Sequence, residues 1–254
     1  MRALVLQSAV WITALLLWAL LTETKAVDPL LLASPSDTAR ALLDGIGSFV
    51  LVRALGCTLL RALAGFLIAT LIGVPLGLVL GGFASVNEVL GSFVDGLRSM
   101  PATALYPVFL LAFGLGDLSK IAVATFICTW AMAIYSAYGV RSSGETRRFL
   151  LRLHNVPWSQ ILLDGLLFPA MPSIIAGMRT VLSLAWVVTI GVEMIVGTKY
   201  GIGQAIFDAQ NTFRIPLMYA SIVLAALAGI LMNQFFILAA KWLTPWGEGG
   251  ASQP

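Results

Sequence analysis

Apolar segments about as long as a bilayer is thick recur along this chain, and they exclude an ordinary soluble fold. Hydrophobic residues make up 59% of the 254 residues and charged residues only 11%, whereas a soluble domain carries roughly a quarter charged residues. The length allows about six spanning helices of roughly 20 residues each, with no stretch left for a separate soluble domain. The sequence therefore predicts an all-α integral membrane protein with one membrane domain.

Six segments are predicted to span the membrane: residues 4–22, 58–83, 97–117, 120–139, 173–196 and 216–240. The first could instead be a signal peptide, but its length is closer to that of a span, and TKA before Val27 is a poor cleavage site. Residues 23–54 predict a loop at the aqueous interface that contains an amphipathic helix, which begins at SPSD, residues 34–37.

The second predicted span carries glycines four residues apart, at Gly73, Gly77 and Gly81. Small residues at this spacing leave one face of a helix bare, so that the backbone of a neighbouring helix can approach closely. Packing inside a helix bundle explains this stripe, and a hinge at Pro75 is the alternative explanation.

The third predicted span is interrupted by Pro101 and Pro107 and ends in GLGD, which predicts a short, distorted helix. Interrupted spans often line transport pathways, because backbone groups without helical partners are tolerated only beside water or protein. Proline kinks also occur in passive helices, so both interpretations stay open. Pro101, Tyr106 and Pro107 are candidate residues of a translocation path.

Glu193 is the clearest ionisable residue inside a span, with no other charge between Arg179 and Lys199. Such a group is costly to bury, so it faces the protein interior or a water-filled cavity, or it reaches interfacial water from near the end of its span. Glu193 and Trp186 join the candidate path residues. Arg61 and Arg179 lie near the ends of their spans and are expected to extend toward the interface.

The sequence contains none of the motifs that would make it an enzyme. GxxxxGK[ST], HExxH and GxSxG are absent, and a single histidine cannot build a multi-histidine metal site. Cys57 and Cys128 lie in apolar segments and are expected to be packed thiols. The scattered basic residues form no nucleic-acid footprint. We therefore expect no catalytic residue, no metal and no cofactor bound by this chain.

A basic insert, residues 141–172, separates the fourth and fifth predicted spans. A capping box of Ser142 and Glu145 begins an amphipathic helix, Asn155 and Pro157 end it, and a second helix is predicted over 158–168, before the PAMP stretch leads into the next span. The insert residues with a candidate docking role are Arg147, Arg148, Phe149, Leu150, Arg152, Leu153, His154, Asn155, Pro157 and Trp158. Such a helix pair can rest on lipid headgroups or fit a groove of a soluble partner.

The charge distribution orients the predicted bundle. Arg141 and the arginines of the insert form the tightest basic cluster and fall on the same side as Arg2 and Lys241. Because basic clusters in short loops favour the cytoplasm, we expect the insert and both termini to be cytoplasmic.

Three stretches carry a resemblance to a known family: RALAGFLIATLIGVPLGLVLG (61–81), LRSMPATALYPVFLLAFGLGDLSKI (97–121) and PSIIAGMRTVLSLAWVVTIGVEMIVGTKYGIGQAI (172–206). The chain resembles a permease subunit of an ABC-type importer, in the nitrate, sulfonate, taurine and bicarbonate branch of the binding-protein-dependent permeases. In that family the cytoplasmic insert docks into a cleft of the ATP-hydrolysing subunit through a Glu-Ala-Ala motif followed by a glycine. The corresponding positions here hold Phe149, Leu150, Leu151 and Asn155. The spacing of the insert therefore matches the family, but the motif residues themselves are replaced, so the motif is degenerate.

The resemblance implies a transport subunit for a small anion such as a sulfonate, nitrate or bicarbonate. Its partners would be ABC ATPase subunits that bind ATP and Mg²⁺, a second permease subunit that is the same or a related chain, and a periplasmic or surface solute-binding protein. Residues 1–50 would form the first span and an external loop, 51–240 the permease core and 241–254 a cytoplasmic tail, in a bacterial inner membrane. The alternatives are a stand-alone secondary transporter that uses Glu193 as an ion or proton site, and a membrane scaffold that transports nothing.

Overall fold

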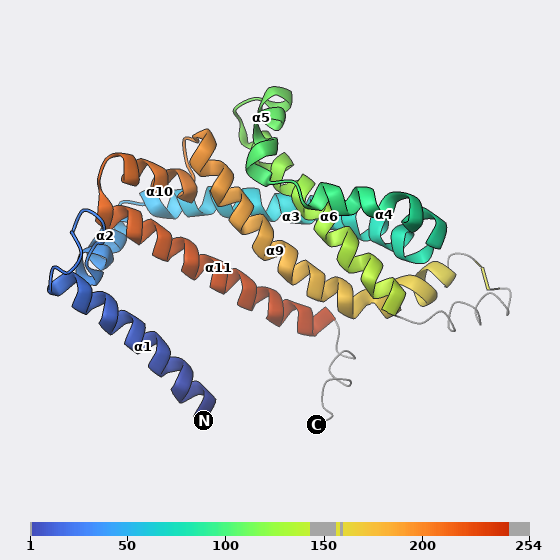
Figure 1. Ribbon diagram of the computed structural model, residues 1–254, viewed down its shortest axis with the longest axis horizontal. Helices are drawn as coiled ribbons and strands as arrows, with labels where there is room; N and C mark the ends of the chain where they lie inside the picture. Colours follow the sequence, from blue (N-terminus) through green and yellow to red (C-terminus); the bar gives the residue numbers. More distant parts are fainter. Residues whose placement is uncertain (1, 143–155, 158–159, 244–254) are drawn as a thin grey trace. The chain divides into compact units, whose positions relative to one another are not determined.

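A computed structural model describes residues 2–142, 156–157 and 160–243, and these residues are helical without any β-strand among them (Figure 1). The elements are α1 (Arg2–Glu23), α2 (Pro35–Gly47), α3 (Val50–Gly82), α4 (Ala84–Arg98), α5 (Ala102–Phe113), α6 (Asp117–Ser142), the π-helical segment η1 (Ile161–Leu167), α9 (Phe168–Val196), α10 (Ile202–Asn211) and α11 (Ile215–Leu243). The chain divides into two compact units. The N-terminal unit holds Met1–Thr58 and Gly197–Ala228, and the core unit holds Leu59–Val196 and Gly229–Pro254.

Four helical segments are long and apolar enough to cross a membrane: Val50–Gly82, Asp117–Ser142, Ile161–Val196 and Ile215–Trp242. Two shorter apolar helices, Ala9–Glu23 and Ala102–Phe113, correspond to the first and third predicted spans. With 12 residues, α5 is about 18 Å long, well short of the roughly 30 Å of a bilayer core. The all-α membrane fold is thus confirmed, and the third predicted span is the short helix that its prolines indicate.

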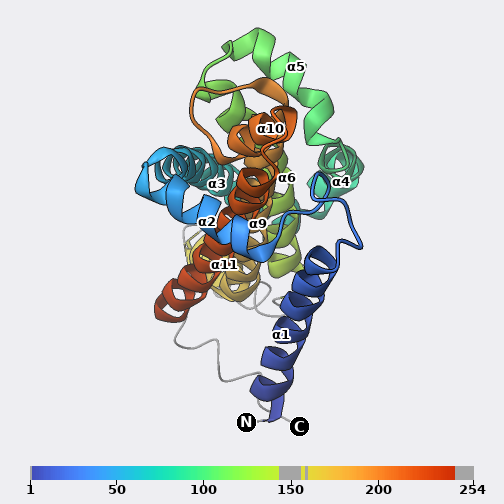
Figure 2. The same ribbon diagram turned by 90° about the vertical axis from the view of Figure 1, so that its left-hand side faces the viewer.

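The centre of the core unit is the pair α6 and α9, which lie side by side (Figures 1 and 2). The buried residues between them are small or flexible, among them Cys128, Met132 and Ala185, and Cys128 is a packed free thiol as expected. The chain runs out of α6 at Ser142 and returns through η1 into α9. The start of α6 and the end of α9 are therefore at one end of this pair, and the connection 143–160 is at the other.

The predicted glycine stripe of α3 is the seam along which α3 packs on α6. A Cβ atom added at Gly73 would lie 2.7 Å from the carbonyl oxygen of Thr129, and one at Gly81 would lie 2.6 Å from that of Ala137. Gly77 faces the backbone of Ala133 in the same way. Packing therefore explains the stripe, and α3 continues as one helix through Pro75.

Helix α4 is an element that the sequence analysis did not assign. Its 15 residues mix polar and apolar side chains, so they lack the long apolar run by which the spans were recognised. Val94 is buried against Leu80 and Ala137, and Arg141 donates to the Asn87 side chain. These contacts hold α4 along α6 (Figure 1).

The connection into α9 differs from the prediction of one helix over 158–168 and a separate span over 173–196. From Gln160 onward the helix is continuous through η1 and α9, with Pro172 inside it. The π-helical segment η1 ends two residues before Pro169, and its wider turns suit this proline, because a proline clashes with the carbonyl group four residues before it in a regular α-helix. The predicted end of the second helix at residue 168 is therefore wrong.

The N-terminal unit contains the predicted interfacial helix, α2. Ser34 caps it by accepting a hydrogen bond from the backbone N–H of Asp37 at 3.1 Å, at the SPSD stretch that predicted this start. Thr58 at the end of this unit's part of α3 accepts a hydrogen bond from the N–H of Ile202 at 2.9 Å, which anchors the start of α10. The predicted first span is helical as α1, and Trp18 donates to the carbonyl oxygen of Ala33.

Candidate functional site

A buried ion pair joins α3 to α9 inside the core unit. Nη1 of Arg61 lies 2.5 Å from Oε1 of Glu193, and the two residues are only 5% and 0% exposed. A charge buried this deeply is tolerated when an opposite charge and hydrogen bonds replace the lost water. The pair therefore explains how both residues can lie within apolar helices.

Asp117 contacts the other side of the same guanidinium group. Oδ1 of Asp117 accepts from Nε of Arg61 at 2.9 Å and lies 2.8 Å from Nη2, while 63% of the Asp117 side chain is exposed. Arg61 thus has one buried and one exposed carboxylate partner. The planar guanidinium group presents separate edges to its partners, which a lysine ammonium group cannot do.

Lys120 adds a second buried cation, at 1% exposure. Its Nζ atom donates to the carbonyl oxygens of Leu115 and Gly116 at 3.3 and 3.2 Å, and its charge also interacts with those of Arg61, Asp117 and Glu193. With two cations and two carboxylates, the formal charge of this cluster is zero. We refer to these four residues, Arg61, Asp117, Lys120 and Glu193, as the charge cluster.

The secondary structure places the charge cluster at one end of the core unit. Asp117 and Lys120 belong to the first turn of α6, and Glu193 belongs to the last turn of α9, which ends before Gly197 with a φ of 71°. Since α6 and α9 are connected through residues 143–160 at their other ends, the cluster lies at the end opposite to that connection.

The structure decides between the two interpretations of Glu193, because the carboxylate faces the protein interior and not interfacial water. The expectation that Arg61 extends to the interface is wrong, since Arg61 is only 5% exposed and pairs with the buried carboxylate of Glu193. Arg179 is exposed and donates through Nε to Asn233. Asp117 and Lys120 were missed; a lone arginine and a lone glutamate in two apolar helices were the available signal that opposite charges pair there.

The other candidate path residues differ in how close they lie to Glu193. Tyr106 is buried on α5, in a cluster with Val188 and Val192 of α9, one residue from Glu193. Trp186 is buried nearer the start of α9 than Glu193, beside Gly229. Pro101 and Pro107 are exposed at the start and middle of α5. The structure therefore brings Tyr106 to the part of α9 that carries Glu193, but not the two prolines.

The candidate docking residues fall almost entirely outside the described residues. These are Arg147, Arg148, Phe149, Leu150, Arg152, Leu153, His154, Asn155 and Trp158. Pro157 is described and exposed, and its carbonyl oxygen accepts from the N–H of Gln160 at 2.9 Å, at the start of the helix that continues into η1.

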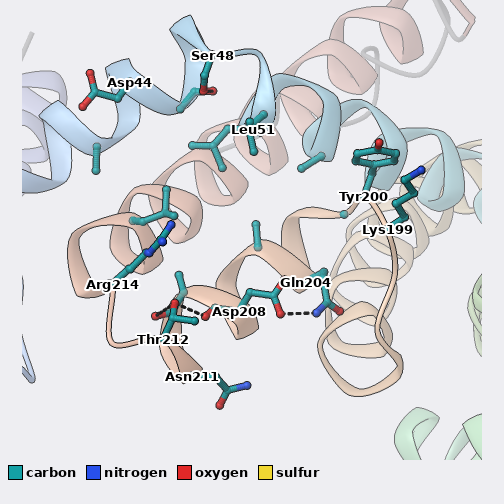
Figure 3. Close-up of a pocket in the computed structure, with 18 residues that line it drawn as sticks. Asp44, Ser48, Leu51, Lys199, Tyr200, Gln204, Asp208, Asn211, Thr212 and Arg214 are labelled. Carbon is teal, nitrogen blue, oxygen red and sulfur yellow. Dashed lines mark hydrogen bonds between the residues drawn. The ribbon is translucent and has the colours of Figure 1, made fainter.

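A separate cleft of about 860 Å³ lies within the N-terminal unit (Figure 3). It is formed by α2, the start of α3, the loop before α10, α10 itself and the turn into α11. Its charged lining residues are Asp44, Lys199, Asp208 and Arg214. Asp208 accepts from the side chain of Gln204 at 2.6 Å, as the dashed line in Figure 3 shows. Because acidic and basic side chains both line it, the cleft is not complementary to ions of one sign of charge.

No group of three or more His, Cys, Asp or Glu side chains among residues 2–142, 156–157 and 160–243 could hold a metal ion. The charge cluster has two carboxylates, and both contact Arg61.

Comparison with known proteins identifies a family that matches most of this chain. The family described as "Binding-protein-dependent transport system inner membrane component" matches residues 73–246. A protein named as an aliphatic sulfonates transport permease, SsuC of Bacillus subtilis, is 28% identical over 244 residues, which cover 93% of this chain and 88% of SsuC. The taurine transport system permease protein TauC of Escherichia coli is 25% identical over 237 residues, which cover 91% of this chain and 86% of TauC.

A third relative is the bicarbonate transport system permease protein CmpB of Synechococcus elongatus, which is 27% identical over 73% of this chain and 67% of CmpB. Among solved structures, a chain of the MetNI methionine ABC transporter in an inward-facing conformation superposes with a TM-score of 0.69 at 19% identity. The match covers 78% of this chain and 97% of that chain, so the two share a fold.

Proposed function

Because the chain belongs to the family of binding-protein-dependent transport system inner membrane components, we propose that it is the permease subunit of an ATP-driven importer for a small anion. The family match carries this proposal, since it covers residues 73–246 and includes the end of α3 and all helices from α4 to α11. The apolar helices and the shared fold with a MetNI chain support it.

The names of the relatives support the solute class. SsuC, TauC and CmpB are named for aliphatic sulfonates, taurine and bicarbonate, and each of these solutes carries an anionic oxygen group. We propose a solute of the same kind, of which nitrate is a further example. An external solute-binding protein would deliver it to the end of the core unit that carries the charge cluster.

ATP would act through partner subunits. The sequence has no phosphate-binding loop, so ATP and Mg²⁺ would be bound by two ABC ATPases. Residues 147–158 would dock in the ATPase cleft, and a difference in docking between the ATP-bound and ATP-free states would bias the bundle between its inward-open and outward-open forms. The degenerate motif fits either a dedicated ATPase or a heteromeric permease in which a related chain carries the typical loop.

This assignment orients the bundle, with the 143–160 connection and both termini in the cytoplasm and residues 197–214 as an external lip. Tyr106, Trp186 and Glu193 would lie along the path, and Pro101 and Pro107 would shape the short helix α5 beside it. The external placement of the charge cluster follows, because it lies opposite to the 143–160 connection.

Copurification tests the proposed coupling. The full chain, expressed with its ATPase, is expected to retain that ATPase, and a variant with Phe149→Asp and Leu153→Asp is expected to lose it, because the apolar face of the predicted docking helix gains two charges. Exposed Leu118 on α6, changed to Asp, is the matched control and should leave retention unchanged. Failure of the wild-type chain to retain an ATPase would contradict the importer.

Uptake separates the alternatives. An ATP-driven importer stops when cellular ATP is depleted, whereas a secondary transporter that uses Glu193 stops with an uncoupler and tolerates ATP depletion. The buried pairing of Glu193 with Arg61 disfavours a freely exchanging proton site. A scaffold would retain a soluble partner without any uptake.

A further inference from the structure

Arg61 contacts two carboxylates that differ in their access to solvent. The Glu193 side chain is 0% exposed and the Asp117 side chain is 63% exposed, although both lie within hydrogen-bond distance of the same guanidinium group. Glu193 is therefore a permanent counter-ion, held inside the bundle. Asp117 can exchange its contact with Arg61 for contact with water by rotation of its own side chain.

This exchange would change the net charge of the charge cluster. Arg61 and Lys120 are both buried, and one of their two positive charges is uncompensated when Asp117 turns away. A buried positive charge is unfavourable unless another anion takes the position. A monovalent anion restores the neutrality of the cluster, whereas a cation increases the excess charge.

The exposure of Asp117 leaves room for such an exchange. Asp117 is the first residue of α6, and 63% of its side chain is exposed, so its carboxylate can turn into solvent. Lys120 binds the carbonyl oxygens of Leu115 and Gly116, so the loop backbone stays anchored while the carboxylate moves. All of these residues belong to the core unit.

We propose that Arg61 binds the anionic group of the transported solute at the external end of the core unit, and that Asp117 occupies this position in the absence of solute. The identification of the bound anion as the transported solute rests on the proposed function. The binding site itself follows from a buried guanidinium group whose Nε and Nη2 atoms are covered by the exposed carboxylate of Asp117.

The geometry specifies the class of ligand. A single atom of Asp117, Oδ1, contacts both Nε and Nη2 of Arg61, whereas a planar or tetrahedral oxyanion can place one oxygen on each of these two atoms. Monovalent sulfonates, nitrate and bicarbonate present such oxygens, whereas chloride offers a single contact. The site therefore selects a monovalent oxyanion by charge and by shape.

Binding to the full chain in lipid nanodiscs tests the site. Radiolabelled methanesulfonate, nitrate and bicarbonate serve as separate probes in equilibrium dialysis at constant ionic strength in sodium chloride. Asp117→Asn is expected to bind at least one probe more tightly than wild type, by about tenfold if Asp117 occupies the site about 90% of the time. Equal affinity of Asp117→Asn and wild type for all three probes, or binding by neither, would overturn the proposal.

A second variant removes the cation without leaving a buried charge unpaired. The double change Arg61→Gln and Glu193→Gln keeps hydrogen-bonding side chains of similar size and is expected to abolish probe binding. Asp95→Asn is the control for Asp117→Asn, because Asp95 is an equally exposed acid on α4. Arg179→Gln controls for the lost arginine, and both controls should bind the probe like wild type. Retained binding in the double variant would also overturn the proposal.

The outcomes distinguish this inference from the proposed function. If the wild-type chain retains its ATPase and takes up solute while Asp117→Asn changes no affinity, the site is wrong and the importer stands. If Asp117→Asn binds a probe more tightly but no ATPase is retained, the anion site stands and the importer fails.

Discussion

The two ends of the contact between α3 and α6 are held together by different physical means. At one end, Gly73, Gly77 and Gly81 of α3 let the backbone of α6 approach closely. At the other end, Arg61 of α3 pairs with Asp117 of α6 and with Glu193 of α9. The first end depends on shape, and the second on charge.

The difference matters because lipid provides no hydrophobic force between helices. Close backbone packing gains its stability from many contacts at fixed distances, so it tolerates little movement. An ion pair with an exposed partner can exchange that partner for water or for another anion. The glycine seam is thus suited to hold the bundle, and the charge cluster to respond to a ligand.

Arg61→Ala is expected to cause the largest effect on stability, a loss of about 3–5 kcal/mol, because it leaves the Glu193 carboxylate buried without its cation. Titration of the detergent-solubilised chain with a denaturing detergent, followed by circular dichroism, measures the loss. The double change Arg61→Gln and Glu193→Gln should recover most of it. A single Arg61→Ala variant as stable as wild type would show that Glu193 does not depend on this pair.

Gly81→Ala is expected to cost about 1–3 kcal/mol, because its Cβ atom would lie 2.6 Å from the carbonyl oxygen of Ala137, where only a shift of the whole helix relieves the clash. The same denaturation experiment measures the cost.

The neighbouring residue provides the control for this substitution. A Cβ atom at Gly82 would meet only the end of the Leu166 side chain, at 3.3 Å, which can rotate away. Gly82→Ala should therefore change stability by less than about 0.5 kcal/mol. Equal costs at the two positions would mean that the seam is not held by close packing.

Asp117→Asn is expected to have the smallest effect at the charged end, about 1 kcal/mol, because water can reach the side of Arg61 that Asp117 covers and partly replace the lost carboxylate. Thermal unfolding followed by tryptophan fluorescence measures it. A loss as large as that of Arg61→Ala would show that Asp117 is a fixed structural partner, and it would remove the contrast between the two carboxylates of Arg61.

The sequence was sufficient to predict the elements whose signal is local. Apolar runs predicted the membrane helices, the SPSD stretch predicted the start of α2, and the glycine spacing predicted a packing face on α3. Composition and residue periodicity are sufficient to predict these elements, because every spanning helix must expose apolar side chains to the same lipid surroundings. The family followed from matching stretches and agrees with the match over residues 73–246.

Elements with a weak local signal were missed or misjudged. Helix α4 has no long apolar run, and it is held by Val94 and Asn87 against α6, far along the chain. The helix predicted to end at residue 168 instead continues from η1 into α9. For α4, the contacts that stabilise the helix come from outside the local sequence.

The sequence by itself determined that this chain is a helical membrane protein of the permease type, because a spanning helix must satisfy its own backbone hydrogen bonds and expose apolar side chains. Only the tertiary structure decided what its rare charges do. Arg61, Asp117 and Glu193 are separated by up to 132 positions in the sequence, and nothing in their local patterns pairs them. Folding brings them together at one end of the α6 and α9 pair, where the low dielectric makes each charge depend on the others.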